Sequence, residues 1–456
     1  MKNFFKKAFL ALCIISIASC SDDDDTTFIP DAMTIADFVA DNADYSSLLA
    51  ALERTNLDVT LNGNGTFTVF APNNAAFTEF LGGTPLEDVP VETLEQILLN
   101  HVLGTTQAST SLTTGYVKNL ATESNSSTNI SMYINTTNGV VINGEATVTT
   151  PDIMTDNGII HAVDKVIPLP TMLTFVTADS NFSSLAGAAT TSGFDTDFVA
   201  VLSGEDSNLT LLAPDNDAFT ALGDISGLST AALEQVLLNH VIAGTNISTS
   251  LTTSYNNTLA TYGDTMDNLS IYINTDSGVS FNGISEVSEA DIVASNGVIH
   301  KVNAVITLPT VVTFATADAT FSNLVAALTR DDQLDENYVA TLSTENGTSP
   351  APFTVFAPTD DAFASLLTEL GAASLADIAE ATLTATLNLH VVAEANVREE
   401  NLMTGTVTTL GGDITADATN ATLTDANDRV SNIIVTNVQA ANGVIHAIDK
   451  VILPEL

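Results

Sequence analysis

The chain has 456 residues, of which 45% are hydrophobic and 14% are charged. Disorder requires low hydrophobicity, so this composition argues against a disordered chain. Eleven basic residues against 55 acidic ones give a formal net charge of −44. Such a charge repels phosphate backbones and anionic headgroups, which argues against nucleic acid as a partner.

Residues 1–19 are predicted to be a lipoprotein signal peptide. Three lysines precede an apolar run at residues 8–18, which is too short to span a bilayer stably. Residues 17–20 read IASC, which resembles a bacterial lipobox. That resemblance implies cleavage before Cys20 and attachment of a lipid to its thiol. A plain signal peptide with a chance cysteine is the alternative.

Residues 20–28 are expected to form an acidic tether, because Ser21 is followed by four consecutive aspartates. The run resembles the acidic tag of surface-exposed lipoproteins in the Bacteroidetes. It predicts an outer-membrane lipoprotein that faces outward and touches the membrane through its lipid alone. A periplasm-facing protein is the alternative. Cys13 lies in the segment to be removed, so the mature chain would have one cysteine and no internal disulfide.

All six histidines fall in two motifs that occur three times. One ends an apolar helical run, as in ILLNHV at 97–102, and the other follows an Asn-Gly turn, as in NGIIHAVDKVI at 157–167. The helix-final histidines are His101, His240 and His390, and the strand histidines are His161, His300 and His446. The repeat is longer than the roughly 20–50 residues of a solenoid unit, so each copy should have its own core.

The three copies predict three domains, at residues 29–168, 169–308 and 309–456. The joints read Ile167-Pro168-Leu169-Pro170 and Thr307-Leu308-Pro309. They contain no Gly/Ser tract and no run of charge, and proline restricts its own backbone and that of the residue before it. We therefore expect closely coupled domains that form an elongated rod with restricted bending.

Each repeat opens with helix-like apolar spacing, at residues 38–52 in the first copy. A short strand ending in Ala-Pro follows at 67–72, and then a helix that Asn73 can cap. A further helix ends at His101. Period-2 stretches such as 130–134 then predict strands. Helices in front of strands favour an α+β fold, with helices beside a mainly antiparallel sheet.

Together these motifs resemble the fasciclin domain. The resemblance rests on TVFAPNNAAF at 68–77, TLLAPDNDAF at 210–219, TVFAPTDDAF at 354–363, the helix-final histidine and the Asn-Gly-x-Ile-His strand. It implies a β-sandwich wedge flanked by helices, an adhesive or matrix-interacting role and no catalytic activity. Animal fasciclin domains often carry Tyr-His at the helix end. Here Asn100, Asn239 and Leu389 replace that tyrosine, so integrin-type recognition is not carried over.

Histidine pairs suggest a zinc site, because imidazole is a common zinc ligand. The recurring candidates for a third ligand are Asp164, Asn303 and Asp449, three residues beyond the strand histidine. Residues i and i+3 of a strand point to opposite faces, so they suit a shared site poorly. We therefore expect neither metal nor cofactor, and buried imidazoles that lock helix to sheet through backbone hydrogen bonds.

The sequence also lacks a nucleophile elbow, a P-loop, an H-E-x-x-H motif and a catalytic cysteine, so we expect no enzyme. The acidic cluster of Asp331, Asp332, Asp335 and Glu336 lacks EF-hand spacing and is interpreted as a solvated loop.

The expected partner is an unidentified protein or polysaccharide ligand at the cell surface. Glycan binding is the alternative to adhesion, but the chain has no tryptophan. Tyr133 and Tyr272, which recur on one strand, are interpreted as packing residues and not as a sugar platform.

Overall fold

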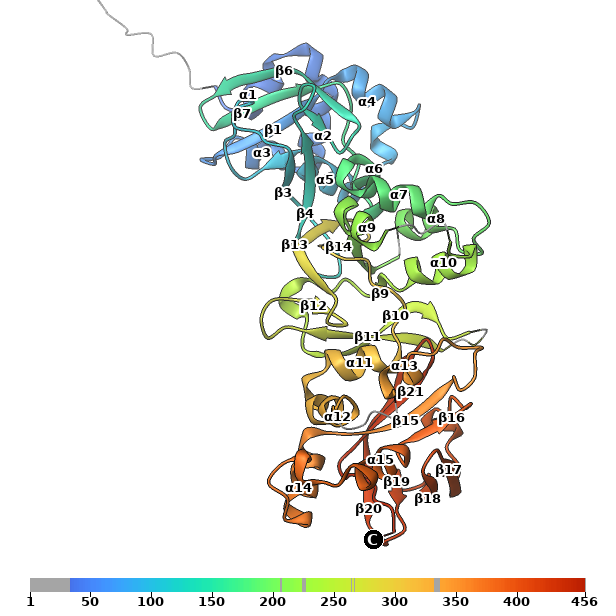
Figure 1. Ribbon diagram of the computed structural model, residues 1–456. Helices are drawn as coiled ribbons and strands as arrows, with labels where there is room; N and C mark the ends of the chain where they lie inside the picture. The colour runs from blue at the N-terminus through green and yellow to red at the C-terminus, as the bar shows by residue number, and fades with distance from the viewer. Residues whose placement is uncertain are drawn as a thin grey trace, which may run out of the picture.

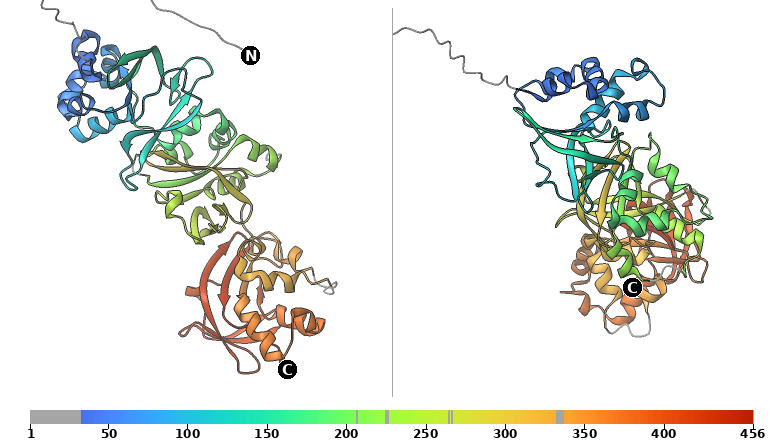
Figure 2. Two further views of the ribbon diagram at one scale, coloured as in Figure 1. Left: turned by 90° about the vertical axis from the view of Figure 1, so that its left-hand side faces the viewer. Right: turned by 90° about the horizontal axis from the view of Figure 1, so that it is seen from above.

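The structure is a computed structural model that describes residues 33–205, 207–223, 227–263, 265, 267–331 and 337–455. The expected signal peptide, Cys20 and the acidic tether lie outside these residues, as do Asp332, Asp335 and Glu336 of the acidic cluster. Three domains follow one another along an elongated molecule, and the C-terminus lies at the end opposite to the first domain (Figure 1). The left view of Figure 2 shows the same succession from another side.

One order of elements recurs in the three domains. The first contains α1 (Ile35–Asp41), η1 (Ala43–Tyr45), α2 (Ser46–Thr55), α3 (Leu57–Leu61), β1 (Phe67–Pro72), α4 (Asn74–Leu81), η2 (Leu86–Asp88), α5 (Val91–Asn100), β2 (Val102–Leu103), β3 (Gly115–Thr122), β4 (Asn129–Asn135), β5 (Val141–Ile142), β6 (Ala146–Thr155) and β7 (Gly158–Val163). The second contains α6 (Met172–Ala178), η3 (Ser180–Phe182), α7 (Ser183–Ala189), α8 (Phe198–Ser203), β8 (Leu209–Pro214), α9 (Asn216–Leu222), α10 (Thr230–Leu238), β9 (Val241–Ala243), η4 (Ser248–Ser250), β10 (Ser254–Thr261), β11 (Asn268–Asn274), β12 (Ser280–Phe281), β13 (Ser285–Ala294) and β14 (Gly297–Val302). The third contains α11 (Val311–Ala317), η5 (Ala319–Phe321), α12 (Ser322–Leu328), α13 (Tyr338–Leu342), β15 (Phe353–Pro358), α14 (Asp360–Leu370), η6 (Leu375–Asp377), α15 (Glu380–Asn388), β16 (Val391–Ala393), η7 (Glu399–Asn401), β17 (Gly405–Thr409), β18 (Gly412–Asp417), β19 (Thr422–Thr424), β20 (Val430–Ala440) and β21 (Gly443–Ile448).

The strands of each domain form one seven-stranded sheet in the same order. In the first domain this order is β2-β1-β7-β6-β5-β4-β3, and the third repeats it as β16-β15-β21-β20-β19-β18-β17. The second keeps the order but closes into a barrel, because β9 also pairs with β10 at Ile242 and Thr258. In the first domain the pair β1–β7 is parallel and its other strand pairs are antiparallel. The mainly antiparallel sheet predicted from the sequence is confirmed.

The long strand β6 bends the sheet into a wedge. Its first residues pair with β5 and the rest pair with β7, with two shifts of register. Asp152 sits at the second shift with a left-handed backbone, φ 60°. Such bulges bend a strand and increase its twist. The strands on either side of β6 thus form two layers that face each other. The predicted β-sandwich wedge flanked by helices is confirmed.

Alternation along β1 fills two cores in each domain. Val69 and Ala71 point into the core beneath the helices, whereas Phe70 points into the core inside the wedge. Successive side chains of a strand face opposite sides, so one strand serves both cores. Counterparts of both cores occur in the second and third domains.

The opening helical pattern of each repeat is two helices and not one. Asn42 ends α1 and its side chain caps η1, and Asp179 and Asp318 do the same in the later domains. In the third domain the axis bends by 96° at this break. The apolar spacing continues across the cap, and therefore the periodicity alone did not reveal the break.

Candidate functional site

The helix-final histidine joins the end of a helix to the segment that leaves the sheet. His101 is 2% exposed. Its Nδ1 donates to the Ile97 carbonyl at 2.7 Å, and its Nε2 accepts from the Ile167 amide at 2.8 Å. His240 repeats this geometry with Val236 and Ile306, and His390 with Thr386 and Ile452.

These bonds fix the charge state of the helix-final histidines. Because Nε2 accepts from a backbone amide, the ring must be neutral and carry its proton on Nδ1. Burial disfavours the charged form and lowers the pKa of His101, His240 and His390 to about 4. Both ring nitrogens are occupied by the backbone, so neither has a lone pair to offer to a metal ion.

The strand histidine uses its two nitrogens in the opposite sense. Nε2 of His161 donates to the Gln107 carbonyl at 3.0 Å, and Nδ1 accepts from the Asp152 amide at 3.2 Å. The Asp152 carboxylate accepts from the Ser109 amide and hydroxyl. The strand histidine therefore holds the bulge of the sheet against the loop that contains Gln107 and Ser109. Equivalent bonds hold His300 to Asn246 and Asp291, and His446 to Val397 and Asn437.

The asparagine of the Asn-Gly turn ties each domain together, a role that the sequence did not predict. Asn157 accepts from the Ile35 amide at 2.9 Å and donates to the Leu61 and Gly63 carbonyls. It thereby joins the first helix of the domain to its last strand. Asn296 and Asn442 make the same three bonds in their own domains. The glycine that follows is required because a Cβ on Gly158 would lie 2.2 Å from the Phe67 carbonyl oxygen.

The candidate third ligands are also engaged by the backbone. Asp164, Asn303 and Asp449 each accept from a backbone amide of the neighbouring strand, at 2.6–2.8 Å. Within the described ranges no three His, Cys, Asp or Glu side chains group as metal ligands would. In the structure these three side chains therefore connect neighbouring strands of the sheet.

The first joint is built on a buried carboxylate of the second domain. Asp179 is 3% exposed and accepts from the hydroxyls of Tyr116 at 3.1 Å and Tyr133 at 3.3 Å, both from the first domain. Its Oδ1 also accepts from the Asn181 amide at the start of η3. Tyr116 packs edge-on against Phe175, with ring centroids 5.4 Å apart. The joint therefore combines aromatic packing with charge-assisted hydrogen bonds.

The second joint repeats this arrangement. Tyr255 donates to Asp318 at 2.9 Å and packs edge-on against Phe314 at 5.6 Å. Burial and the Asp318 carboxylate raise the pKa of Tyr272 to about 12, as burial and Asp179 do for Tyr133. Tyr133 and Tyr272 are 2% and 5% exposed, and each belongs to the core of the next domain. The packing interpretation of these two tyrosines is confirmed.

Buried asparagines attach the interdomain segments to the domains before them. Asn100 is fully buried and donates to the Ile167 and Pro168 carbonyls at 3.2 and 3.0 Å. Asn239 does the same with Ile306 and Thr307. Strands also meet across the joints, where Ser131 accepts from the Val293 amide and Ser270 from the Gln439 amide, both at 2.9 Å. Both interdomain segments are thus fixed by direct hydrogen bonds.

The residues that build the joints are replaced at the equivalent positions on the outer sides of the first and third domains. In the first domain Asn42 stands where the later domains have Asp179 and Asp318. In the third domain the joint tyrosines are replaced by Thr406 and Thr415, which pair with each other as Tyr116 and Tyr133 do. Leu389 stands where the earlier domains have Asn100 and Asn239, and it lies in the core inside the wedge. A comparison of the repeats in the sequence could have revealed this difference.

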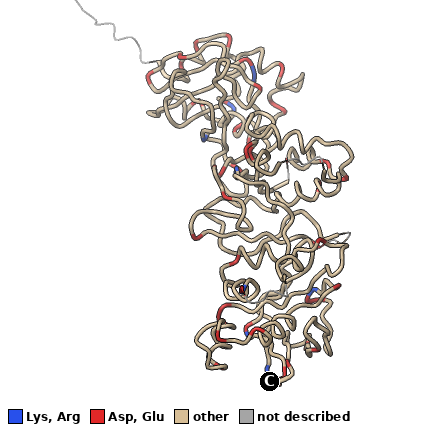
Figure 3. Tube along the Cα trace, in the orientation of Figure 1, with Lys and Arg blue, Asp and Glu red and all other residues tan. Residues whose placement is uncertain are grey.

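Acidic residues occur over all three domains and are not gathered in one patch (Figure 3). Within the described residues no single helix is long and apolar enough to cross a membrane. The helices Val311–Ala317 and Ala319–Leu328 satisfy length and composition only when they are taken together across their bend.

Comparisons with known proteins agree on the family. The family model of the fasciclin domain matches residues 43–170, 180–309 and 319–454. The pig transforming growth factor-beta-induced protein ig-h3 is 27% identical over 431 residues, which cover 90% of this chain and 56% of that protein. Human periostin is 28% identical over 436 residues, which cover 92% of this chain and 47% of that protein. The chain therefore spans about half the length of these two relatives.

A solved structure of a FAS1 domain pair from the insect cell adhesion molecule fasciclin I is also similar. It has a TM-score of 0.40 and 18% identity, and the match covers 58% of this chain and 97% of that one. The three matches to the family model span most of the described residues, one for each repeated set of helices and strands. The chain belongs to the fasciclin-domain family and carries three such domains in tandem.

Proposed function

We propose that the chain is a non-enzymatic adhesion or matrix-interaction protein of a bacterial cell envelope. In this proposal Cys20 carries a lipid that holds the protein at the outer membrane, facing outward. The three domains project from that anchor as a stiff rod, and the outer part of the rod binds a protein ligand on a neighbouring cell or in the matrix.

The observation that carries the proposal is the repetition of one built joint. Each joint buries two tyrosines against an aspartate of the next domain and fixes the interdomain segment through a buried asparagine. A direct interface of this kind holds two domains in one orientation, whereas flexible linkers leave relative motion as the default. Reach with a fixed direction suits adhesion better than catalysis, and the family resemblance points to the same role.

The histidines support the non-enzymatic part of the proposal. Histidine is the side chain best suited to acid–base chemistry near neutral pH. All six of them have both ring nitrogens bonded to the backbone and are at most 2% exposed. None is placed to exchange a proton with a substrate.

Glycan binding is the second candidate, and a polar cavity at the second joint favours it. This cavity, of about 450 Å³, is lined by Asn257, Asp267, Arg398 and Asn437 among others. Arg398 reaches from the third domain to Asp267 of the second at 3.3 Å. Amide, carboxylate and guanidinium groups of this kind can bind sugar hydroxyls. Against this candidate, the aromatic faces of Tyr133 and Tyr272 are buried in the joints.

The experiment compares cells that display the full chain with cells that carry Cys20→Ser, under protease treatment and then in adhesion. We expect the full chain to be degraded on intact cells and to retain those cells on a layer of sibling cells. Cys20→Ser should abolish lipid labelling, surface degradation and retention. Retention that persists with Cys20→Ser would contradict the anchored adhesin.

A second arm separates the two candidate ligands. Cells that carry Arg398→Ala are tested on the same cell layer and on immobilised polysaccharides. We expect adhesion to the cell layer without any need for Arg398. Binding to polysaccharides alone, lost in Arg398→Ala, would instead establish glycan capture.

A further inference from the structure

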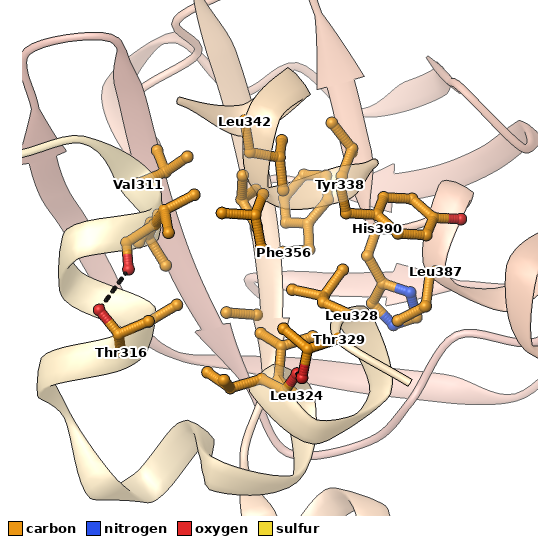
Figure 4. Close-up of a pocket in the computed structure, with 18 residues that line it drawn as sticks. Val311, Thr316, Leu324, Leu328, Thr329, Tyr338, Leu342, Phe356, Leu387 and His390 are labelled. Carbon is orange, nitrogen blue, oxygen red and sulfur yellow. Dashed lines mark hydrogen bonds between the residues drawn. The ribbon is translucent and has the colours of Figure 1, made fainter. Parts of the chain in front are cut away.

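An apolar cavity opens into the helical core of the third domain. It has a volume of about 290 Å³ and lies between the helices α11, α12 and α13 and the strands β15 and β21. Its lining includes Ala315, Val325 and Ile445. Leu328, Leu342 and Phe356 also line it (Figure 4). An engineered apolar cavity of about 150 Å³ takes up benzene, so this one has room for about a dozen carbon atoms.

The two polar side chains of the inner wall are already satisfied. The hydroxyl of Tyr338 lies 3.2 Å from Asn388 Oδ1 and 3.4 Å from the Thr384 carbonyl, outside the set of lining residues. Both nitrogens of His390 are bonded to the backbone. What these residues present to the cavity is therefore mainly ring carbon, and a charged group inside would find no partner.

Comparison with the other two domains explains why the space exists. Five residues after the N-cap threonine, the first domain has Val39 and the second has Val176, each 1% exposed. The third domain has Ala315 at this position, in the wall of the cavity. Two methyl groups are therefore missing from one point of the helical core, and they are present in both sister domains.

The threonine side chains at the mouth of the cavity offer hydrogen-bond acceptors and not donors. The exposed Thr316 and Thr329 have donated their hydroxyl hydrogens to helix carbonyls, at 2.9 Å to Val312 and 2.8 Å to Val325. Their oxygens keep lone pairs that can accept a further hydrogen bond. Such a mouth suits a hydroxyl that donates, whereas a carboxylate would meet acceptors and a strongly acidic protein.

We propose that the third domain binds an uncharged aliphatic molecule of about ten to twelve carbon atoms, with at most a hydroxyl group at its outer end. The chain fills the cavity beside Ala315, and the hydroxyl lies at the mouth near Thr316 and Thr329. This site is independent of the adhesive role proposed above, because it lies inside one domain and uses none of the joint residues.

The experiment uses the chain from Ser21 to Leu456, which contains every described residue. Binding of 1-decanol and of decanoate is measured directly by isothermal titration calorimetry. We expect 1-decanol to bind with a dissociation constant in the micromolar range, which lies within the bounds for small ligands. Decanoate should be at least tenfold weaker.

Two matched variants locate the site. Ala315→Val places in the third domain the residue that its sisters carry, so it should fold, and it should weaken 1-decanol at least tenfold. Ala326→Val makes the same change on the exposed side of α12 and should leave binding unchanged. The proposal is overturned if 1-decanol fails to bind, if Ala315→Val binds as tightly as the unaltered chain, or if decanoate equals 1-decanol.

Discussion

The joints and the equivalent positions on the outer sides of the first and third domains are built on the same framework but carry different residues. In the first and second domains the edge of the sheet carries two tyrosines. The end of the helix carries the asparagine that donates hydrogen bonds to the interdomain segment. In the third domain Thr406, Thr415 and Leu389 occupy these positions. The fasciclin framework thus tolerates both solutions, and the joint residues are an addition to it.

The two joints also differ from each other in one respect. At the first joint Lys118 donates to Ser131 and reaches the Asp291 carbonyl of the second domain at 2.7 Å. At the second joint the shorter Asn257 stands at this position, opposite Ser270. The polar cavity lies there, and Arg398 crosses it from the other side. Both joints thus share the aromatic and carboxylate contacts. They differ in the polar contacts made at the position of Lys118 and Asn257.

The largest effect is expected when a joint tyrosine is removed. Tyr133→Ala should destabilise the second domain by about 3–5 kcal/mol, because the ring is buried in that domain's core and leaves a cavity. Hydrogen exchange of the second domain measures the loss. Thr415→Ala, the equivalent change in the third domain, should cost less than about 0.5 kcal/mol. Equal losses of stability at both positions would contradict a stabilising role of the joint tyrosine.

Acid should weaken all three domains through the helix-final histidines. Their folded pKa of about 4 lies below the ordinary value of 6.5, so the unfolded chain takes up protons first as the pH falls. The contribution is complete above pH 6.5 and is lost between pH 6.5 and 4, at about 1.4 kcal/mol per unit and up to about 3 kcal/mol per domain. Denaturation at pH 7.5, 6.5 and 5.5 measures the slope before most carboxylates titrate. Stability that is flat over this range would contradict the neutral, buried state of these rings.

His240→Ala should destabilise the second domain by about 1–3 kcal/mol, because the Val236 carbonyl and the Ile306 amide lose their partner. The same variant should reduce the acid sensitivity of the second domain alone, and the remainder comes from His300, whose pKa burial also lowers. Zinc should not raise the melting temperature of the unaltered chain. A zinc-dependent rise that disappears in His240→Ala would revive the metal interpretation.

The smallest effect concerns the charge of the joint carboxylate. Asp179→Asn keeps the cap of η3, as Asn42 does for η1, but weakens the bonds from Tyr116 and Tyr133. The loss should be about 1 kcal/mol. Asn42→Asp in the first domain meets no tyrosine from another domain among the described residues and should be near neutral. The comparison fails if the two exchanges have equal effects on thermal unfolding.

Much of the fold could be predicted because its signals are local and repeated. Apolar spacing, the capping residue Asn73 and the period-2 strands each report on a few neighbouring residues, and three copies made them reliable. The joints were harder to predict, because Tyr133 meets Asp179 only across a domain boundary. The role of Asn157 was missed because a turn explained its position without regard to its partners Ile35 and Leu61. The cavity beside Ala315 depends on how three helices pack, which no local pattern records.

The stiffness of the array is the central claim, and solution scattering on the chain from Ser21 to Leu456 tests it most directly. Removal of residues 1–20 takes away three lysines and no acidic residue, which changes the net charge from −44 to −47. The account predicts a narrow, extended distribution of interatomic distances that does not change with moderate salt. A broad distribution that contracts as salt screens this charge would mean that repulsion holds flexible domains apart, and the fixed joints would be contradicted.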